Sequence, residues 1–159
     1  MSTDTQDNPG VIAPPPFIYL GGLALGLLLH RILPLKYLSR TPRGITLTIG
    51  STCVSVALTV GILGFRQMRA ANTNINPAQP ATTIVTEGPF RFTRNPVYLS
   101  MTLLYLGIMF LVNSLWLLLI LPPILGLMNV GVIAREERYL EHKFGAQYLA
   151  YKQRVRRWL

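Results

Sequence analysis

The chain has 159 residues, of which 50% are hydrophobic and 13% are charged, and it carries a formal net charge of +9. This composition excludes an ordinary soluble domain, in which about a quarter of the residues are charged. The basic residues flank hydrophobic runs instead of forming a patch with interleaved aromatic residues, which argues against binding to nucleic acid. We therefore predict an all-α integral membrane protein: a helical bundle of about four transmembrane helices with a cytoplasmic amphipathic C-terminal tail.

The N-terminal part contains a polar lead and two hydrophobic segments. Residues 1–16 hold two Asp, four Pro and no Lys or Arg, so we expect a disordered lead and not a signal peptide. A single membrane domain is expected over residues 17–159, with its first span at about residues 17–35. The second span, residues 44–65, has 22 residues without a charge, which is long enough to cross about 30 Å of hydrocarbon.

A polar loop, residues 66–94, follows the second span. Within it, residues 82–85 are predicted to form a short extended segment that leads into a Gly-Pro turn. The next 40 residues, 95–134, carry no charge, which is too long for one span and right for two. The expected turn is Asn113-Ser114, and Pro122-Pro123 is expected to bend the last helix. The two predicted spans are therefore about 96–112 and 115–134.

The tail, residues 135–159, is charged and amphipathic. Its aromatic and leucine residues recur at helical spacings of three or four, with a break at Gly145. Four spans place both termini on one side of the membrane, and that side then holds 11 of the 15 Lys and Arg residues. The positive-inside rule assigns this side to the cytoplasm, and we expect the plasma (inner) membrane.

Two polar clusters remain once topology is accounted for. Arg94, Asn95 and Tyr98 begin the third span, and Arg135 and Glu136 follow the fourth. An antiparallel hairpin brings these two clusters side by side. Arginine and amide groups suit a carboxylate and Glu suits an ammonium group, so the clusters are expected to bind a zwitterion. The same groups could instead pair with one another as salt bridges, for example Glu136 with Arg94.

The start of the third span has its own signature. Pro96 suits a first helical turn, because its missing N–H costs nothing there, and Asn95 can cap the helix. The free N–H groups of that turn favour a bound anion. A competing interpretation is an ordinary interfacial anchor, since Arg and Asn-Pro are common at the ends of membrane helices.

Longer patterns add a family resemblance. The segment GPFRFTRNPVYLS, followed about forty residues later by EERYLEHKFGAQYLAYKQRVRRW, resembles the paired signature of the isoprenylcysteine carboxyl methyltransferase family, which is related to the phospholipid methyltransferases. The similarity covers residues 72–158. It implies a small helical membrane bundle with a cytoplasmic pocket for S-adenosylmethionine, and a lipophilic methyl acceptor taken from the bilayer.

The resemblance also implies roles for single residues. It places Phe90 beside the adenosine. It also places four residues along the cofactor through their backbone groups: Thr82, Thr83, Ile84 and Val85. It places Asn95, Pro96 and Tyr98 at the cofactor and Glu136 on the methionine ammonium, and we add Arg94 as a cation near the cofactor. Arg135 and Tyr98 are the expected catalytic residues, positioned beside the acceptor.

The chain departs from the family pattern at two positions. Many members carry His where this chain has Asn95, and Asn cannot take up a proton. The prenylcysteine enzymes carry an arginine for the substrate carboxylate where this chain has Val132, and Arg135 is only a nearby substitute. These departures weaken the carboxyl-methylation interpretation and leave the acceptor nucleophile open.

We therefore predict a methyltransferase that moves a methyl group from S-adenosylmethionine to a lipophilic acceptor, with no metal and no nucleic-acid partner. The alternative is a noncatalytic membrane module that binds anionic lipid or a protein partner through its basic tail. The acceptor is expected to enter sideways between the spans. Small residues could leave a gap for it or could equally be close-packing contacts: Gly44, Gly50, Gly61, Gly64 and Gly107.

Overall fold

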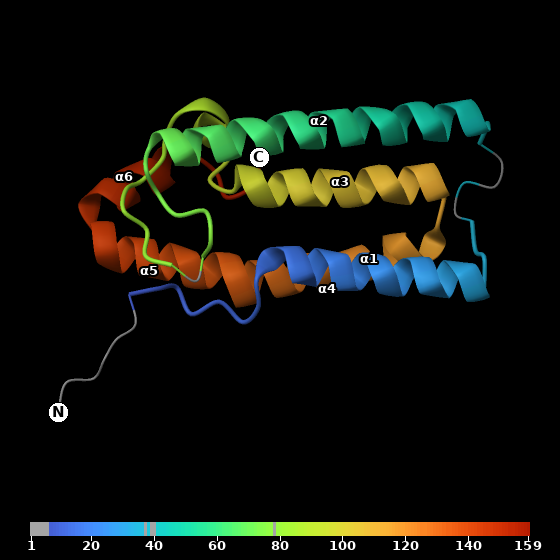
Figure 1. Ribbon diagram of the computed structural model, residues 1–159, viewed down its shortest axis with the longest axis horizontal. Coiled ribbons are helices and arrows are strands. Elements are labelled where there is room, and N and C mark those ends of the chain that lie inside the picture. Colours follow the sequence, from blue (N-terminus) through green and yellow to red (C-terminus); the bar gives the residue numbers. More distant parts are fainter. Residues whose placement is uncertain (1–6, 37, 39–40, 78) are drawn as a thin grey trace.

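A computed structural model describes residues 7–36, 38, 41–77 and 79–159 of the chain (Figure 1). Residues 1–6 of the predicted disordered lead lie outside the described residues. Every regular element in the described part is a helix, which confirms the predicted all-α class. The elements are α1 (Pro15–Ile32), α2 (Arg43–Ala70), the 3₁₀ turn η1 (Gly88–Arg91), α3 (Pro96–Val112), α4 (Leu115–Leu127), the π-helical segment η2 (Met128–Ile133), α5 (Ala134–Phe144) and α6 (Ala146–Arg154).

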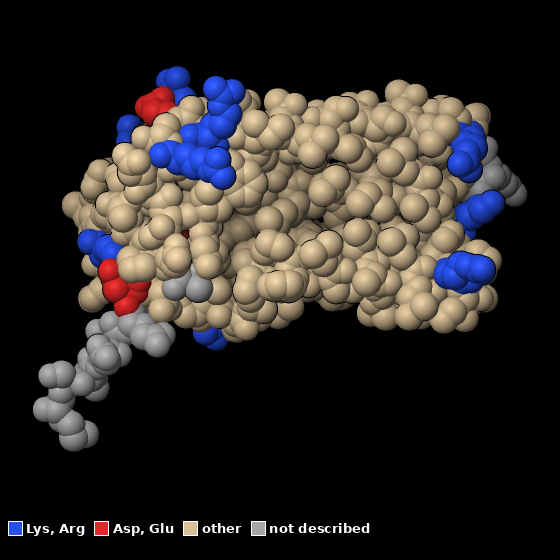
Figure 2. All heavy atoms as spheres, viewed as in Figure 1, with Lys and Arg blue, Asp and Glu red and all other residues tan. Residues whose placement is uncertain are grey.

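The long helices have the composition of a membrane bundle. Three are long and apolar enough to cross a bilayer: α1, α2 and the continuous stretch Leu115–Phe144. Helix α3 is apolar but shorter, at 17 residues. Figure 2 shows charged side chains at both ends of the molecule and a broad uncharged belt between them. The N-terminal segment, α5 and α6 lie at one end of the bundle, opposite the α1–α2 connection (Figure 1).

Local sequence signals set the element boundaries. Asn113 ends α3 in the left-handed conformation with φ 54°, and the Ser114 side chain accepts the N–H of Leu117, so the predicted turn is confirmed. Gly145 separates α5 from α6 with φ 49°, as the spacing predicted. Helix α4 continues through Pro122 and Pro123, and the irregular turns follow it as η2.

The fourth helical stretch is longer than predicted. It does not stop at residue 134: η2 leads directly into α5, so that α4, η2 and α5 form one rod of 30 residues. The uncharged sequence ends at Ala134, and α5 therefore begins where the chain leaves the uncharged belt. Helix α2 likewise continues past residue 65 to Ala70. The helices end where backbone hydrogen bonding ends. The predicted boundaries differ because they were set where the apolar residues end.

Helices α2 and α3 lie side by side (Figure 1), and glycine allows their close approach. A Cβ atom on Gly107 would lie 2.7 Å from the Val54 side chain and 3.0 Å from the backbone oxygen of Gly50. On Gly61 a Cβ would lie 3.0 Å from Ser100 Oγ. These three glycines are therefore close-packing contacts and not a gap between helices, whereas a Cβ on Gly44 would meet nothing within 4 Å.

Buried hydroxyl groups join the other pair of helices to α3. The Tyr19 hydroxyl of α1 lies 2.7 Å from Thr102 Oγ1, and the Tyr105 hydroxyl donates to the Leu117 carbonyl of α4 at 3.0 Å. Both tyrosines belong to the main hydrophobic cluster, which also contains Met109 and Val132. Both buried tyrosine hydroxyl groups therefore have a partner, as a low-dielectric interior requires.

Residues 7–14 differ from the disorder that we expected for residues 1–16. The Ile12 N–H donates to the Gly131 carbonyl at 3.2 Å, and Arg135 donates to the Gly10 carbonyl at 2.7 Å. Composition predicted disorder because these residues cannot form a core of their own. They are held by contacts with the α4–α5 rod, which lies far away in sequence.

The α2–α3 contact gives a first prediction. Gly107→Ala should destabilise the protein by about 1–3 kcal/mol, because the new methyl group must push α2 away from α3. Thermal unfolding in detergent measures this loss. Gly126→Ala is the matched control, since a Cβ there meets nothing within 4 Å and should leave the unfolding temperature unchanged or higher. Equal unfolding temperatures for the two variants would contradict the close-packing interpretation.

Candidate functional site

A pocket lies at the charged end of the bundle, where four parts of the chain meet. Its walls come from the 73–85 loop, the start of α3, the first turns of α5, and α6, and it encloses a cavity of about 150 Å³. Most of the site residues predicted from the sequence meet in this pocket. Nine of the predicted site residues line it: Thr83, Ile84, Val85, Phe90, Arg94, Asn95, Pro96, Tyr98 and Glu136.

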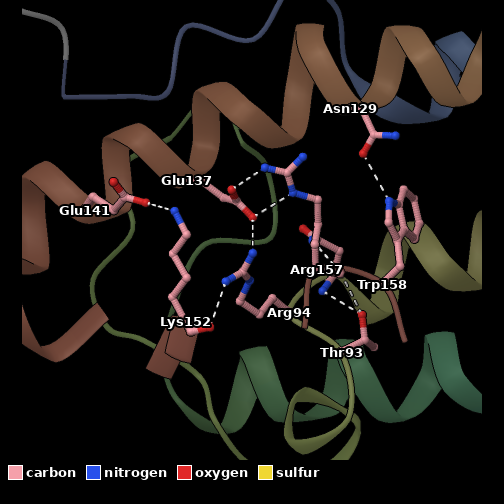
Figure 3. A network of polar contacts seen from close by, with 9 residues as sticks. Thr93, Arg94, Asn129, Glu137, Glu141, Lys152, Arg157 and Trp158 are labelled. Carbon is pink, nitrogen blue, oxygen red and sulfur yellow. Dashed lines mark hydrogen bonds and ion pairs between the residues drawn. The ribbon is translucent and has the colours of Figure 1, made fainter. Parts of the chain in front are cut away.

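Glu137 is the centre of the buried charge network beside this pocket (Figure 3). Its side chain is 6% exposed and accepts from Arg94 at 2.6 Å and from Arg157 at 2.6 and 3.0 Å. Burial alone would raise the pKa of this carboxyl, but the hydrogen bonds and charges of Arg157 and Arg94 outweigh burial and lower it. Glu137 therefore stays ionised and joins α3, α5 and the C-terminal segment.

Glu136, its neighbour in sequence, has a different environment. It lines the pocket, and its Oε1 accepts the Tyr98 hydroxyl at 2.5 Å. No Lys or Arg of the described residues forms an ion pair with it. Burial, with a smaller contribution from the charge of Glu137, raises the pKa of the Glu136 carboxyl to about 7. Glu136 is thus a pocket carboxylate that lacks the cations its neighbour has.

The C-terminal segment returns to the start of α3. The carbonyl of Arg157 accepts from the Asn95 side-chain amide at 2.9 Å and from Thr93 Oγ1 at 3.1 Å, and the Arg156 carbonyl accepts the Arg94 N–H at 3.0 Å. Asn95 occupies the N-cap position, but its side chain makes no capping bond. The predicted Asn95 cap is therefore wrong, because the Asn95 amide is used for a contact that no local pattern announces.

Two predicted residues lie outside the pocket lining. Thr82 makes its hydrogen bonds with residues that follow α2. Its Oγ1 donates to the Asn72 carbonyl at 2.8 Å, and its N–H donates to Thr73 Oγ1. Arg135, predicted to contact the acceptor, donates instead to the Gly10 carbonyl. Arg94 does line the pocket, yet it pairs with Glu137 and not with Glu136. The open alternative of an Arg94–Glu136 pair is thereby excluded.

Sequence reasoning missed several tyrosines of the pocket wall. Tyr148 and Tyr151 of α6 and Tyr139 of α5 all line the cavity, and the Tyr151 hydroxyl donates to the Phe90 carbonyl at 2.8 Å. The signal was present in FGxxYxxY, since residues three apart share one helix face. From this spacing we predicted only an amphipathic tail, with lipid binding as an alternative. The buried Tyr151 shows that part of this face is turned inward.

The residues of this pocket fit S-adenosylmethionine, which carries two cationic groups, a carboxylate and a planar aromatic base. Glu136 offers a carboxylate to a cation. Phe90, Tyr148 and Tyr151 offer aromatic surface to a base. Arg94 Nε is buried and has no hydrogen-bond partner among the described residues, which leaves a donor for a carboxylate. The pocket therefore offers a partner to one cationic group, to the carboxylate and to the aromatic base of this cofactor.

The uncharged belt and the charged pocket together define a helical membrane protein with a polar site at one end of its bundle. Residues 45–147 match the phospholipid methyltransferase family, and this match covers more than half of the chain. The chain belongs to that family, which confirms the resemblance found in the sequence. Membership implies methyltransferase activity at a membrane, and enzymes of this family generally use S-adenosylmethionine.

A relative in Haemophilus influenzae is described as an uncharacterized protein. It is 51% identical over 65 residues, which cover 40% of this chain and 100% of that protein. No solved structure matches the chain.

The Glu137 network gives a second prediction. Glu137→Gln should destabilise the protein by about 3 kcal/mol, because it leaves the buried Arg94 charge without its counter-charge. Thermal unfolding in detergent measures the loss. Glu141→Gln is the matched control: Glu141 pairs with Lys152, and both side chains are partly exposed, so this variant should lose less than about 1 kcal/mol. If both variants unfold at the same temperature, the network does not hold the site together.

Proposed function

We propose that this protein is an S-adenosylmethionine-dependent methyltransferase that methylates a lipophilic acceptor at the cytoplasmic face of the plasma (inner) membrane. The observation that carries the proposal is the difference between the two adjacent carboxylates. Glu137 is paired with two arginines, whereas Glu136 faces the pocket without a cation. A half-buried carboxylate of this kind is suited to a cationic ligand.

Each part of the pocket would then have one binding task. Glu136 accepts from the ammonium group of the cofactor, and Tyr98 holds the Glu136 carboxylate in place through their hydrogen bond. Arg94 Nε, which is buried and lacks a hydrogen-bond partner, donates to the cofactor carboxylate. Backbone groups of residues 83–85 and the ring of Phe90 contact the adenosine part. Thr82 supports this wall from outside the lining.

The protein's contribution to the reaction is mainly alignment. When bound, S-adenosylmethionine supplies an activated methyl group that is displaced in line by a nucleophile. The protein needs to hold donor and acceptor in register and to exclude water. Asn95 donates to the Arg157 carbonyl and so fixes the start of α3; it takes no proton. Tyr98, at the pocket wall, is the residue we assign to the acceptor side.

The acceptor is proposed to come from the bilayer. The apolar helices α1, α3 and α4 surround the region below the pocket, and no charged residue lies in residues 95–134. A water-soluble acceptor would have to share the same polar pocket with the cofactor. An acceptor whose apolar part stays in lipid can bring its reactive group to the interface near Tyr98. An isoprenylcysteine-like acceptor satisfies this description, as does a phospholipid headgroup.

A titration with S-adenosylhomocysteine tests cofactor binding. Wild-type protein in nanodiscs should bind it, and Glu136→Gln should weaken binding at least about tenfold, because one charge-assisted hydrogen bond is lost. The wild-type affinity should fall as the pH decreases through about 7, where Glu136 takes up a proton, and Glu136→Gln should lack this dependence. Isothermal titration calorimetry at several pH values measures both effects.

Glu141→Gln, a Glu→Gln change outside the pocket lining, should bind S-adenosylhomocysteine like the wild type. If the wild-type protein does not bind the ligand in detergent or in nanodiscs, the noncatalytic alternative is favoured over the methyltransferase. If Glu136→Gln binds as tightly as the wild type, the assignment of Glu136 is wrong.

The source of the acceptor has a separate test. Acceptors that share one reactive group and differ only in alkyl chain length are assayed in proteoliposomes with radiolabelled S-adenosylmethionine. Methyl transfer should increase with chain length, because longer chains concentrate the acceptor in the bilayer by about 0.8 kcal/mol for each CH₂ group. A preference for short, water-soluble acceptors would contradict entry from the membrane.

A further inference from the structure

The described N-terminal residues reach the pocket at one position. Pro9 lines the cavity, together with residues of α5 that lie far from it in sequence. We name residues 7–12 the strap. Besides a contact from Tyr139, three polar contacts hold it on the α4–α5 rod: Ile12 N–H to the Gly131 carbonyl at 3.2 Å, Arg135 to the Gly10 carbonyl at 2.7 Å, and Lys143 to the Asp7 carboxylate at 2.6 Å.

Tyr139 joins the strap to the 73–85 loop. Its hydroxyl donates to Asp7 Oδ1 at 2.7 Å and accepts the Ala81 N–H of the 73–85 loop at 3.1 Å. Tyr139 itself lines the pocket. The strap and the 73–85 loop therefore meet at Tyr139, a residue of the pocket wall.

The strap is held weakly compared with the rest of the site. It has no regular secondary structure, and the Asp7 and Ile12 residues at its two ends are 56% and 46% exposed. In the Glu137 network, in contrast, the Glu137 side chain is almost completely buried. Segments with few buried contacts open at a much smaller free energy than the whole fold. The strap can therefore leave the rod while the pocket behind it stays intact.

The strap packs against the α4–α5 rod at a glycine, Gly131. A Cβ atom on Gly131 would lie 2.2 Å from Ile12 Cδ1 and 2.7 Å from Ile12 Cγ1, and its three nearest atoms would all belong to Ile12. A methyl group at this position would thus force the Ile12 side chain to shift. Gly131 lies in η2, directly before the charged first turn of α5.

We propose that the strap is a gate: the pocket ligand enters and leaves when residues 7–12 lift from the α4–α5 rod, and Arg135 is a latch of this gate. The proposal rests on the proposed function in that the ligand is taken to be the methyl donor. It gives Arg135 a role that differs from the acceptor contact expected from the sequence. Arg135 acts through the strap and is a positioning residue, not a catalytic one.

The test measures association and dissociation rates of S-adenosylhomocysteine with the full chain in nanodiscs. Gly131→Ala and Arg135→Ala should each raise both rates by about five- to tenfold, because opening of the strap limits both directions. Gly126→Ala, in the same rod with open space around it, should leave both rates unchanged. In an Ile12→Ala background, Gly131→Ala should have no further effect, because the clashing side chain is gone.

Hydrogen exchange supplies a readout without ligand. The Ile12 N–H should be protected in the wild type and in Gly126→Ala, and it should exchange at least about tenfold faster in Gly131→Ala. Unchanged rates and unchanged protection in both strap variants would overturn the gate, as would a rise in the dissociation rate alone. Failure of the wild type to bind S-adenosylhomocysteine is a different result, and it would overturn the proposed function instead.

Discussion

The pairing of Glu137 with Arg94 and Arg157 is the interaction on which the rest of the site depends. Buried or half-buried charges in a low-dielectric region are tolerated only when opposite charges pair with good geometry. Meeting this requirement fixes the start of α3, the first turn of α5 and the C-terminal segment relative to one another. Two of these parts, the start of α3 and the first turn of α5, belong to the pocket wall, so the ion pairs fix that side of the cavity.

The same arrangement explains why two adjacent glutamates have different tasks. Neighbouring positions on an α-helix point about 100° apart, so one of them can face the arginines while the other faces the pocket. When Glu136 is ionised, the charges of Arg94, Arg157, Glu137 and Glu136 sum to zero. Because both arginines are directed to Glu137, the negative charge of Glu136 remains available to a ligand. This uneven distribution of the arginines gives the site a preference for a cation.

The parts of the structure that the sequence predicted are those that local rules determine. The Asn113-Ser114 turn and the break at Gly145 depend on residues within one helical turn. The predicted pocket residues came from a different source, the family resemblance, and most of them lie on one short segment. The failures share a different cause. The Asn95 amide binds Arg157, and Arg135 binds Gly10, which lies 125 positions away. Such partners are chosen by tertiary packing, and no local pattern contains them.

Helix lengths explain why the pocket lies at the boundary of the membrane. At about 1.5 Å per residue, the 17 residues of α3 span about 25 Å and the 28 residues of α2 about 42 Å, against about 30 Å of hydrocarbon. Because α2 extends beyond α3 at both ends (Figure 1), the loop after α2 folds back over the start of α3. The proposed function places Pro96 and Tyr98 close to the interface, beneath this loop. There a donor dissolved in water and an acceptor dissolved in lipid would reach the same residues from opposite sides.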